Sequence, residues 1–255
     1  MDNLTAPDGF MGTSSSQRSP RTPEWERVRR LYDDPQAPSR VIVARIVDAL
    51  GPQTRAEMAD SAVARCMATL TRASAGDLDE TLMSLDPGLP AAADLAAALR
   101  ACAERDIARR REASRFGELA LDALSASALE IGEGVEEAPG LVRAALARYA
   151  NERRLADLAN TFVSQDMAYA FRHFVERDTP AHVGGPRLRT VREAGSLADE
   201  VADICRQVTR GVPFEGLEDD LLCAVERGPA AGHGFYRTAL TAAVSDSLRE
   251  LGVAP

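Results

Sequence analysis

Lysine is missing from this chain: all 30 of its basic residues are arginine. A G+C-rich genome explains the bias most simply, because the same bias raises alanine, and selection against modification of lysine amines is the alternative. In either case the positive charge lies on guanidinium groups, which pair more readily than lysine in partly buried and interfacial positions. The formal net charge is −9, which argues against nucleic-acid binding over the whole surface but allows a local basic patch.

Long apolar runs and cysteine motifs are missing as well. No stretch is long and apolar enough to cross a bilayer, and none has the charged start and apolar core of a signal peptide. The sequence therefore predicts a cytoplasmic protein without a membrane partner. The cysteines form no CxxC pair and no Cys/His cluster with zinc spacing, so we expect no metal site and no cofactor. Their positions on or near apolar helix stripes predict buried free thiols at Cys66, Cys102, Cys205 and Cys223.

Signatures of common catalytic sites are also absent. The chain has no GxxxxGK[ST] loop, no GxGxxG after a strand, no HExxH and no GxSxG. We therefore predict no catalytic residues, and an enzyme of an unrecognised type stays open as an alternative. Its only support is the i, i+3, i+7 spacing of Asp166, Tyr169 and His173, which suits proton transfer. A polar seam between packed helices is the other interpretation of the same three residues.

Aromatic residues are scarce, at 5% of the chain, and several of them are concentrated between residues 151 and 192. Apolar residues recur there at i, i+3, i+4 and i+7, which predicts one long amphipathic helix. Because each aromatic side chain buries a large apolar area, this helix should lie centrally, with Ser164 and Gln165 on its wetter side. Pro180 should end it near Asp178. The aromatic residues of this stretch are Phe162, Tyr169, Phe171 and Phe174.

Abundant alanine and repeated helical spacing predict an all-α fold, an irregular multi-helix bundle. Residues 1–23 are rich in Ser, Thr, Pro and Gly, and we expect a disordered N-terminal tail there. An acidic, glycine-rich linker near residues 133–137 suggests two helical subdomains, 24–132 and 138–255.

Local signals place several helix ends. Thr54 with Glu57 predicts a capping box, and Ser196 predicts the start of a later helix. A break near Ser114 should divide the long helical segment from about residue 90 to residue 131, and Pro139 suits the first position of a helix. A second capping pattern predicts a short helix over residues 77–85.

A glycine-proline break at residues 184–186 is followed by Arg187, Arg189 and Arg192 with no acidic residue among them. Guanidinium groups beside a glycine turn suit phosphate or carboxylate, because they bind bidentately and the turn offers backbone N–H groups. The alternative is a solvated loop paired with the acidic surface. The predicted ligand-binding residues are Arg172, His173, Arg177, His182, Arg187, Arg189 and Arg192.

Both terminal helices offer apolar faces. Trp25, Leu31 and Tyr32 lie on one face of a short helix, which docks either on the body of the protein or on a partner, and we predict an interface there. The last helix carries apolar residues from Phe235 to Leu251 at near-heptad spacing. That stripe predicts a packing seam, either within the chain or between two copies of it.

Together these patterns favour a non-catalytic helical interaction protein, an adaptor or accessory subunit of a bacterial multiprotein assembly, with another protein as its partner. The first alternative is a binder of nucleic acid or of another phosphate-bearing ligand through the arginine-rich loop. The enzyme of unrecognised type is the second.

Overall fold

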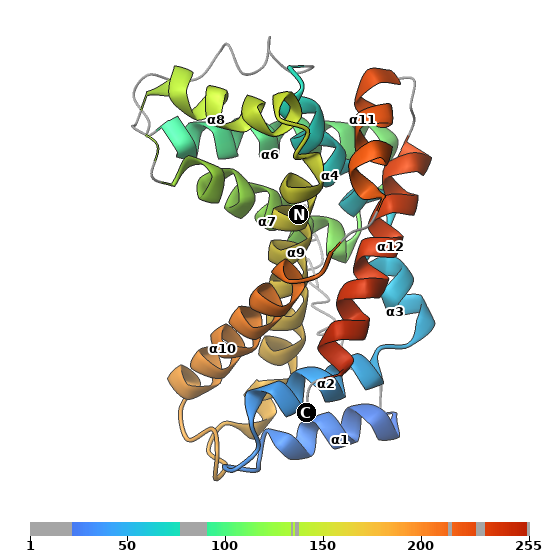
Figure 1. The fold of residues 1–255 in the computed structure, drawn as a ribbon. Coiled ribbons are helices and arrows are strands. Elements are labelled where there is room, and N and C mark those ends of the chain that lie inside the picture. Colours follow the sequence, from blue (N-terminus) through green and yellow to red (C-terminus); the bar gives the residue numbers. More distant parts are fainter. Residues whose placement is uncertain are drawn as a thin grey trace, which may run out of the picture.

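The computed structural model describes residues 22–76, 91–133, 135, 138–213, 216–227 and 233–253. These residues fold into helices with no strand among them, which confirms the predicted all-α bundle (Figure 1). The predicted tail over residues 1–23 lies outside this part of the chain apart from Thr22 and Pro23, and the predicted helix at 77–85 lies outside it entirely. The helices are α1 (Pro23–Leu31), α2 (Ser39–Ala49), α3 (Pro52–Glu57), α4 (Ser61–Ser74), α6 (Ala91–Arg110), α7 (Arg115–Gly132), α8 (Pro139–Asn151), α9 (Leu155–Asp178), the 3₁₀ helix η1 (Thr179–His182), α10 (Val191–Arg210), α11 (Leu217–Arg227) and α12 (His233–Gly252).

Helix α9 passes through the middle of the molecule (Figure 1). It contacts α10 and α7 most extensively, and also α2, α4, α8, α11 and α12. The predicted central helix, and its end at Asp178, are confirmed. The prediction that Ser164 and Gln165 face water is wrong, because both are buried. Neighbouring helices cover α9 on sides that its own amphipathic pattern assigns to solvent.

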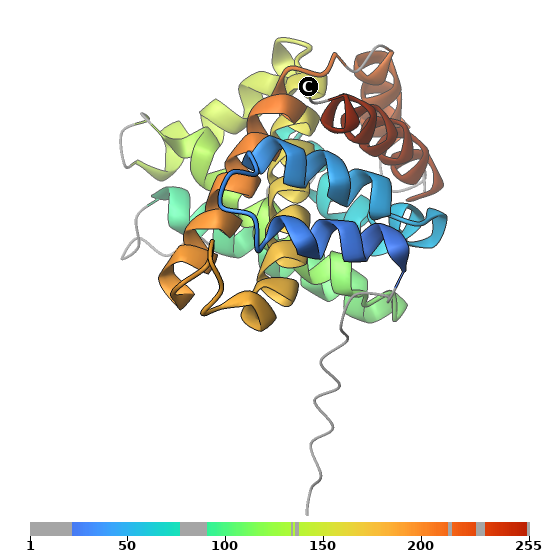
Figure 2. The ribbon, with the colours of Figure 1, turned by 90° about the horizontal axis from the view of Figure 1, so that it is seen from below.

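One hydrophobic core extends through both predicted subdomains. Helix α4, from the first, packs on α7 and α6 but also on α12, α8 and α9 from the second. At the lower end of the molecule α1 and α2 lie side by side across the bundle (Figure 2). The predicted boundary near residues 133–137 therefore does not mark a gap in the apolar core.

The break between α6 and α7 is confirmed at the predicted position. Ser114 caps α7, and its Oγ accepts a hydrogen bond from the Gly117 backbone N–H at 2.9 Å. The chain turns back here, so α6 and α7 pack against each other as neighbours. Pro139 occupies the start of α8, also as predicted, because a proline at the first turn sacrifices no helical hydrogen bond.

Two predicted helix starts are wrong. Thr54 lies inside the short α3, and α4 is instead capped by Asp60, whose Oδ1 accepts from the Ala62 and Val63 backbone N–H groups. Ser196 lies inside α10. Proline at position 52 begins α3 before Thr54 is reached, so the Thr-x-x-Glu pattern falls within a helix that has already started.

The actual start of α10 is a complete capping box. The Thr190 side chain accepts from the Glu193 N–H at 3.2 Å, and the Glu193 carboxylate accepts from the N–H groups of Arg189 and Thr190 at 2.6 and 2.9 Å. Three backbone donors at the helix start are therefore satisfied, which fixes where α10 begins.

The cysteine prediction is confirmed for two of the four residues. Cys66 and Cys205 are buried, and burial raises the pKa of both thiols, so they stay protonated. Cys102 is partly buried, and Cys223 is exposed on α11 because Leu221 and Ala224 occupy the inward side of that helix.

The apolar stripe of α12 packs within the chain. Leu240, Val244, Leu248 and Leu251 are buried, and α12 packs mainly on α4 and α2. Association of two copies through this helix stays a prediction. None of the helices in the described ranges combines the length and the hydropathy needed to span a membrane.

Candidate functional site

The aromatic face of α1 is turned inward. Trp25 and Tyr32 are buried, and the Trp25 ring lies 5.7 Å from the Phe174 ring of α9, centroid to centroid. The Arg177 guanidinium lies over the same indole ring, 5.2 Å from its centroid, and Leu31 is packed at the edge of the core. The structure thus shows the first of the two predicted docking modes, in which α1 covers the body of its own chain.

The Arg187 side chain forms hydrogen bonds with the backbone at the end of α1 and in the segment between α1 and α2. Its Nη1 donates to the carbonyl oxygens of Leu31, Asp34 and Ala37, at 3.4, 3.0 and 2.5 Å. The guanidinium group therefore holds together two segments that are about 150 residues apart in the sequence.

Arg172, Arg177 and His182 are also paired inside the fold. Arg172 contacts Glu176 at 2.7 Å and Asp199 at 3.2 Å, and Arg177 contacts Asp178 at 3.2 Å. In addition, His182 Nδ1 lies 3.0 Å from Asp33 Oδ1.

The remaining members of the predicted set divide into one partly buried histidine and two exposed arginines. His173 Nε2 is buried without a hydrogen-bond partner, and burial, together with the charges of Arg115 and Arg177, lowers the His173 pKa. Arg189 and Arg192 are exposed, and no residue in the described ranges pairs with either guanidinium. These two side chains are the part of the predicted basic cluster that faces solvent unpaired.

Asp166, Tyr169 and His173 lie in different surroundings although they share one side of α9. Asp166 is 2% exposed, and its Oδ1 has no hydrogen-bond partner. Burial raises the Asp166 pKa well above its usual value, with a further contribution from Asp60, the residue that caps α4, so the carboxyl group is neutral near its ordinary titration range. Tyr169, in contrast, lines an open pocket against α10.

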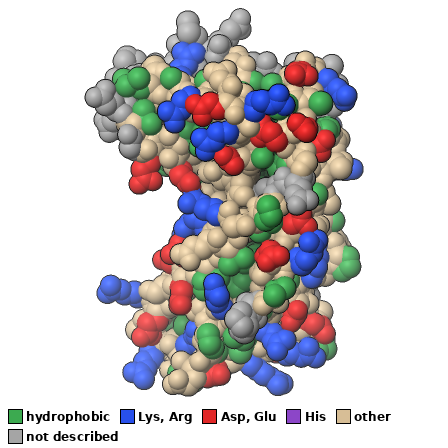
Figure 3. All heavy atoms as spheres, in the orientation of Figure 1, with side chains coloured by type: hydrophobic (Ala, Val, Ile, Leu, Met, Phe, Trp, Pro, Cys, Tyr) green, Lys and Arg blue, Asp and Glu red, His purple; other side chains and the backbone are tan. Residues whose placement is uncertain are grey.

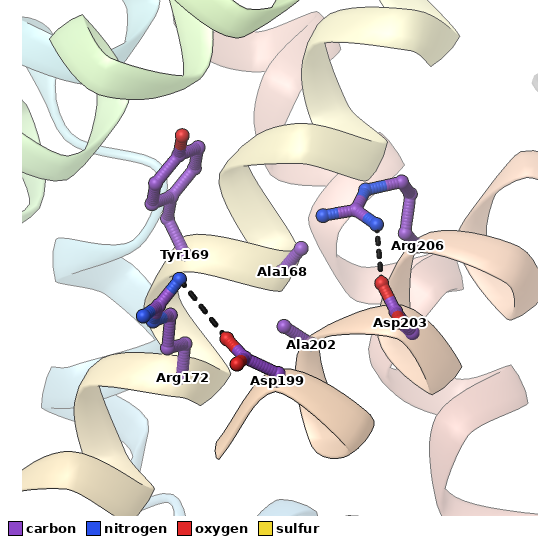
Figure 4. A pocket seen from close by; sticks show the side chains of 7 residues that line it. All are labelled: Ala168, Tyr169, Arg172, Asp199, Ala202, Asp203 and Arg206. Atoms are coloured by element: carbon purple, nitrogen blue, oxygen red, sulfur yellow. Dashed lines mark hydrogen bonds and ion pairs between the residues drawn. The ribbon is translucent and has the colours of Figure 1, made fainter. Parts of the chain in front are cut away.

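That pocket is a polar cleft of about 230 Å³ between α9 and α10 (Figure 4). Ala168 and Ala202 lie deep between the two helices, and charged side chains stand around them. In Figure 4 Arg172 points toward Asp199, and Arg206 points toward Asp203 at 2.5 Å. The sequence did not lead us to three of these residues, Asp199, Asp203 and Arg206. They are separated by four and then three positions on α10, and this spacing is typical of a solvated helix face.

The polar contacts continue from the cleft to α7. Gln165 donates to Glu130 of α7 at 2.8 Å and accepts from Arg206 at 3.1 Å, and Arg210 also pairs with Glu130. The surface is hollowed on this side, between the block of α6, α7 and α8 and the lower helix α10 (Figure 3). Each charged group named here already has a partner of opposite sign or a hydrogen bond.

A second recess, of about 390 Å³, opens where η1 meets the start of α10. Its lining is mostly apolar, and Val191 at its edge is 77% exposed. Arg189 and Arg192 flank Val191 in the sequence and share its exposure. We name this surface the Val191 face. It consists of the residues that line the recess, together with the exposed Arg189 and Arg192 close to Val191 in the sequence; the lining residues are Glu176, Thr179, Pro180, Val183, Val191, Ala194 and Gly195.

In the described ranges no group of three or more His, Cys, Asp or Glu side chains is arranged to hold a metal ion. No family model matches the chain, and neither a curated protein nor a solved structure shows significant similarity to it.

Proposed function

We propose that this protein is a non-catalytic interaction protein, an adaptor or accessory subunit of a bacterial assembly, which binds another protein through the Val191 face. The observation that carries the proposal is the mostly apolar recess beside an exposed valine, whose charged lining residue, Glu176, is paired with Arg172. Two exposed arginines that pair with no described residue lie within two residues of that valine in the sequence. An apolar centre within a rim that contains arginine is the usual anatomy of a protein-binding patch.

The polar cleft supports the choice of the Val191 face by contrast. Covering the Arg172–Asp199 and Arg206–Asp203 pairs would remove four charged groups from water, and each already has its partner. A ligand there gains little to offset the cost of desolvation. At the Val191 face a ligand instead buries an apolar side chain that water already contacts, and burying a valine or leucine contributes about 1.5–3 kcal/mol.

The test is quantitative affinity purification from the native host, without nuclease, using the wild-type protein and two variants. Val191→Gln removes the apolar group without adding charge. Val253→Gln is the matched control, because Val253 is 70% exposed and lies beyond the end of α12. Val191 is the first residue of α10, where a polar side chain is well tolerated. The free energy of unfolding of both variants should therefore lie within about 0.5 kcal/mol of the wild-type value.

We expect one protein to be recovered in stoichiometric amount with the wild type and with Val253→Gln, and to be lost with Val191→Gln. Recovery of the same protein with all three would show that the Val191 face is not the docking surface. Recovery of nucleic acid in place of a protein would overturn the proposal in favour of the first alternative, with Arg189 and Arg192 as the contacts.

A further inference from the structure

The loop that leads to Val191, residues 184–190, is held in place by several contacts. The Gly184 N–H donates to the Leu188 carbonyl at 2.7 Å, Leu188 is buried, and Arg187 is fixed by the carbonyls between α1 and α2. Gly185 allows a close approach, because a Cβ there would lie 2.9 Å from the His182 carbonyl oxygen. The surface is therefore formed before a partner arrives, which lowers the entropic cost of binding.

Arg189 and Arg192 outnumber Glu193, whose carboxylate accepts backbone hydrogen bonds, and the other acidic groups nearby are paired with arginines, so the formal charge of this surface is positive. Glu193 accepts backbone hydrogen bonds at the start of α10, Glu176 pairs with Arg172, and Asp178 is buried beside Arg177. Arg189 and Arg192 remain, and they stand at the positive end of the helix dipole of α10. The local charge is thus opposite in sign to the net charge of −9.

We propose that the partner presents an acidic protein segment in which one large apolar side chain is flanked by Asp or Glu. The apolar side chain enters the recess lined by Pro180, Val183 and Ala194, and its neighbouring carboxylates meet Arg189 and Arg192. A nucleic acid offers negative charge without an apolar side chain, so it fits only half of this surface. The inference rests on the proposed function and adds the chemistry of the partner to it.

The closing experiment selects a random dodecapeptide library, displayed on phage, against the immobilised full-length protein at low salt. Binders that also attach to Val191→Gln are removed. We expect the surviving peptides to be enriched in a Leu, Ile, Met or Phe with Asp or Glu within two positions of it. A peptide of that kind is then synthesised with a fluorophore, and its affinity is measured by anisotropy.

The arginines are tested with that peptide and two double variants. Arg189→Gln with Arg192→Gln should weaken binding about fivefold, as expected for two exposed ion pairs. Arg109→Gln with Arg110→Gln makes the same change in net charge at the end of α6, where both arginines are exposed, and should leave the affinity within about twofold.

The outcomes separate this inference from the proposed function. Enrichment of basic or uncharged peptides, or equal weakening by both double variants, overturns the acidic partner, while a protein captured through Val191 still stands. Failure to select any peptide that depends on Val191 also overturns the inference. If in addition no protein depends on Val191 in the affinity purification, the proposed function fails with it.

Discussion

Two ionisable side chains are buried to the same extent but differ in whether their surroundings favour the charged form: Arg65 of α4 and Asp166 of α9. Each is 2% exposed. Arg65 keeps its charge, because Asp106 lies 2.8 Å away and Glu112 is also in hydrogen-bond contact. Asp166 has no such partner for Oδ1. The comparison shows that burial sets the cost of a charge, and that the neighbours decide whether the charge is kept.

The pKa shifts express the same difference. Burial opposes the charge of Arg65, but the hydrogen bonds that Arg65 donates to Glu112 and Asp106 outweigh it, so the Arg65 pKa is raised above its usual value. For Asp166, burial and the nearby Asp60 act in the same direction and raise the pKa. Asp106 and Glu112 are each about a third exposed, so both carboxylates stay in contact with water while Arg65 reaches them from the core.

The largest expected effect comes from removing the charges of Asp106 and Glu112 beside Arg65. Asp106→Asn with Glu112→Gln keeps the shape of both side chains but removes both charges. We expect the free energy of unfolding, measured in urea at neutral pH, to fall by about 3 kcal/mol, because a buried cation then loses these two counter-charges. The control is Asp48→Asn, which removes an exposed partner of Arg45 and should cost less than about 1 kcal/mol. Equal effects of the two changes would contradict the role given to Arg65.

A smaller and opposite effect is expected at Asp166. A carboxyl group whose folded pKa is raised above its unfolded value, about 3.9, stabilises the fold most at low pH, and this contribution is lost as pH rises above about 4. Asp166→Asn removes that dependence. We expect the variant to be more stable than wild type by about 1–3 kcal/mol at about pH 8, and the difference to shrink toward about pH 4.

Urea unfolding at several pH values measures the Asp166 effect. Asp157→Asn is the control on the same helix, since Asp157 is exposed and paired with Arg154. A stability gain that does not change with pH would mean that the substitution stabilises the fold through packing and not by removing an ionisable group.

The smallest expected effect is at His173, whose lowered pKa has the reverse consequence. A histidine whose folded pKa lies below its unfolded value, about 6.5, stabilises the fold above that value, and the contribution is lost as pH falls. The measurement uses the Asp166→Asn background. There, titration of His173 should lower the free energy of unfolding by less than about 1 kcal/mol as the pH falls from about 7 to about 5, because the ring is only half buried. His173→Gln should abolish that loss, and an unchanged pH profile would show that the ring titrates as it does in the unfolded chain.

Local chemistry was enough to predict much of the fold. The periodicity of α9, the proline after Asp178, the cap at Ser114 and the proline at the start of α8 all lie within a few residues of the structure they specify. The same kind of signal singled out the loop with Arg189 and Arg192. It did not predict that Arg187 would be bound by carbonyls at positions 31 to 37, since nothing near Arg187 in the sequence indicates that contact.

The sequence by itself determined where most helices begin and end and which of their faces are apolar, because hydrogen bonds and side-chain spacing within a helix are local. Only the tertiary structure decided which polar groups are buried and which charges stay free. Arg65 meets its partners 41 and 47 residues away, and Gln165 is enclosed because α7 and α10 both pack on α9. The Arg189 and Arg192 side chains stay unpaired because the acidic groups near them have other partners: Glu193 accepts from backbone N–H groups at the start of α10, and Glu176 pairs with Arg172.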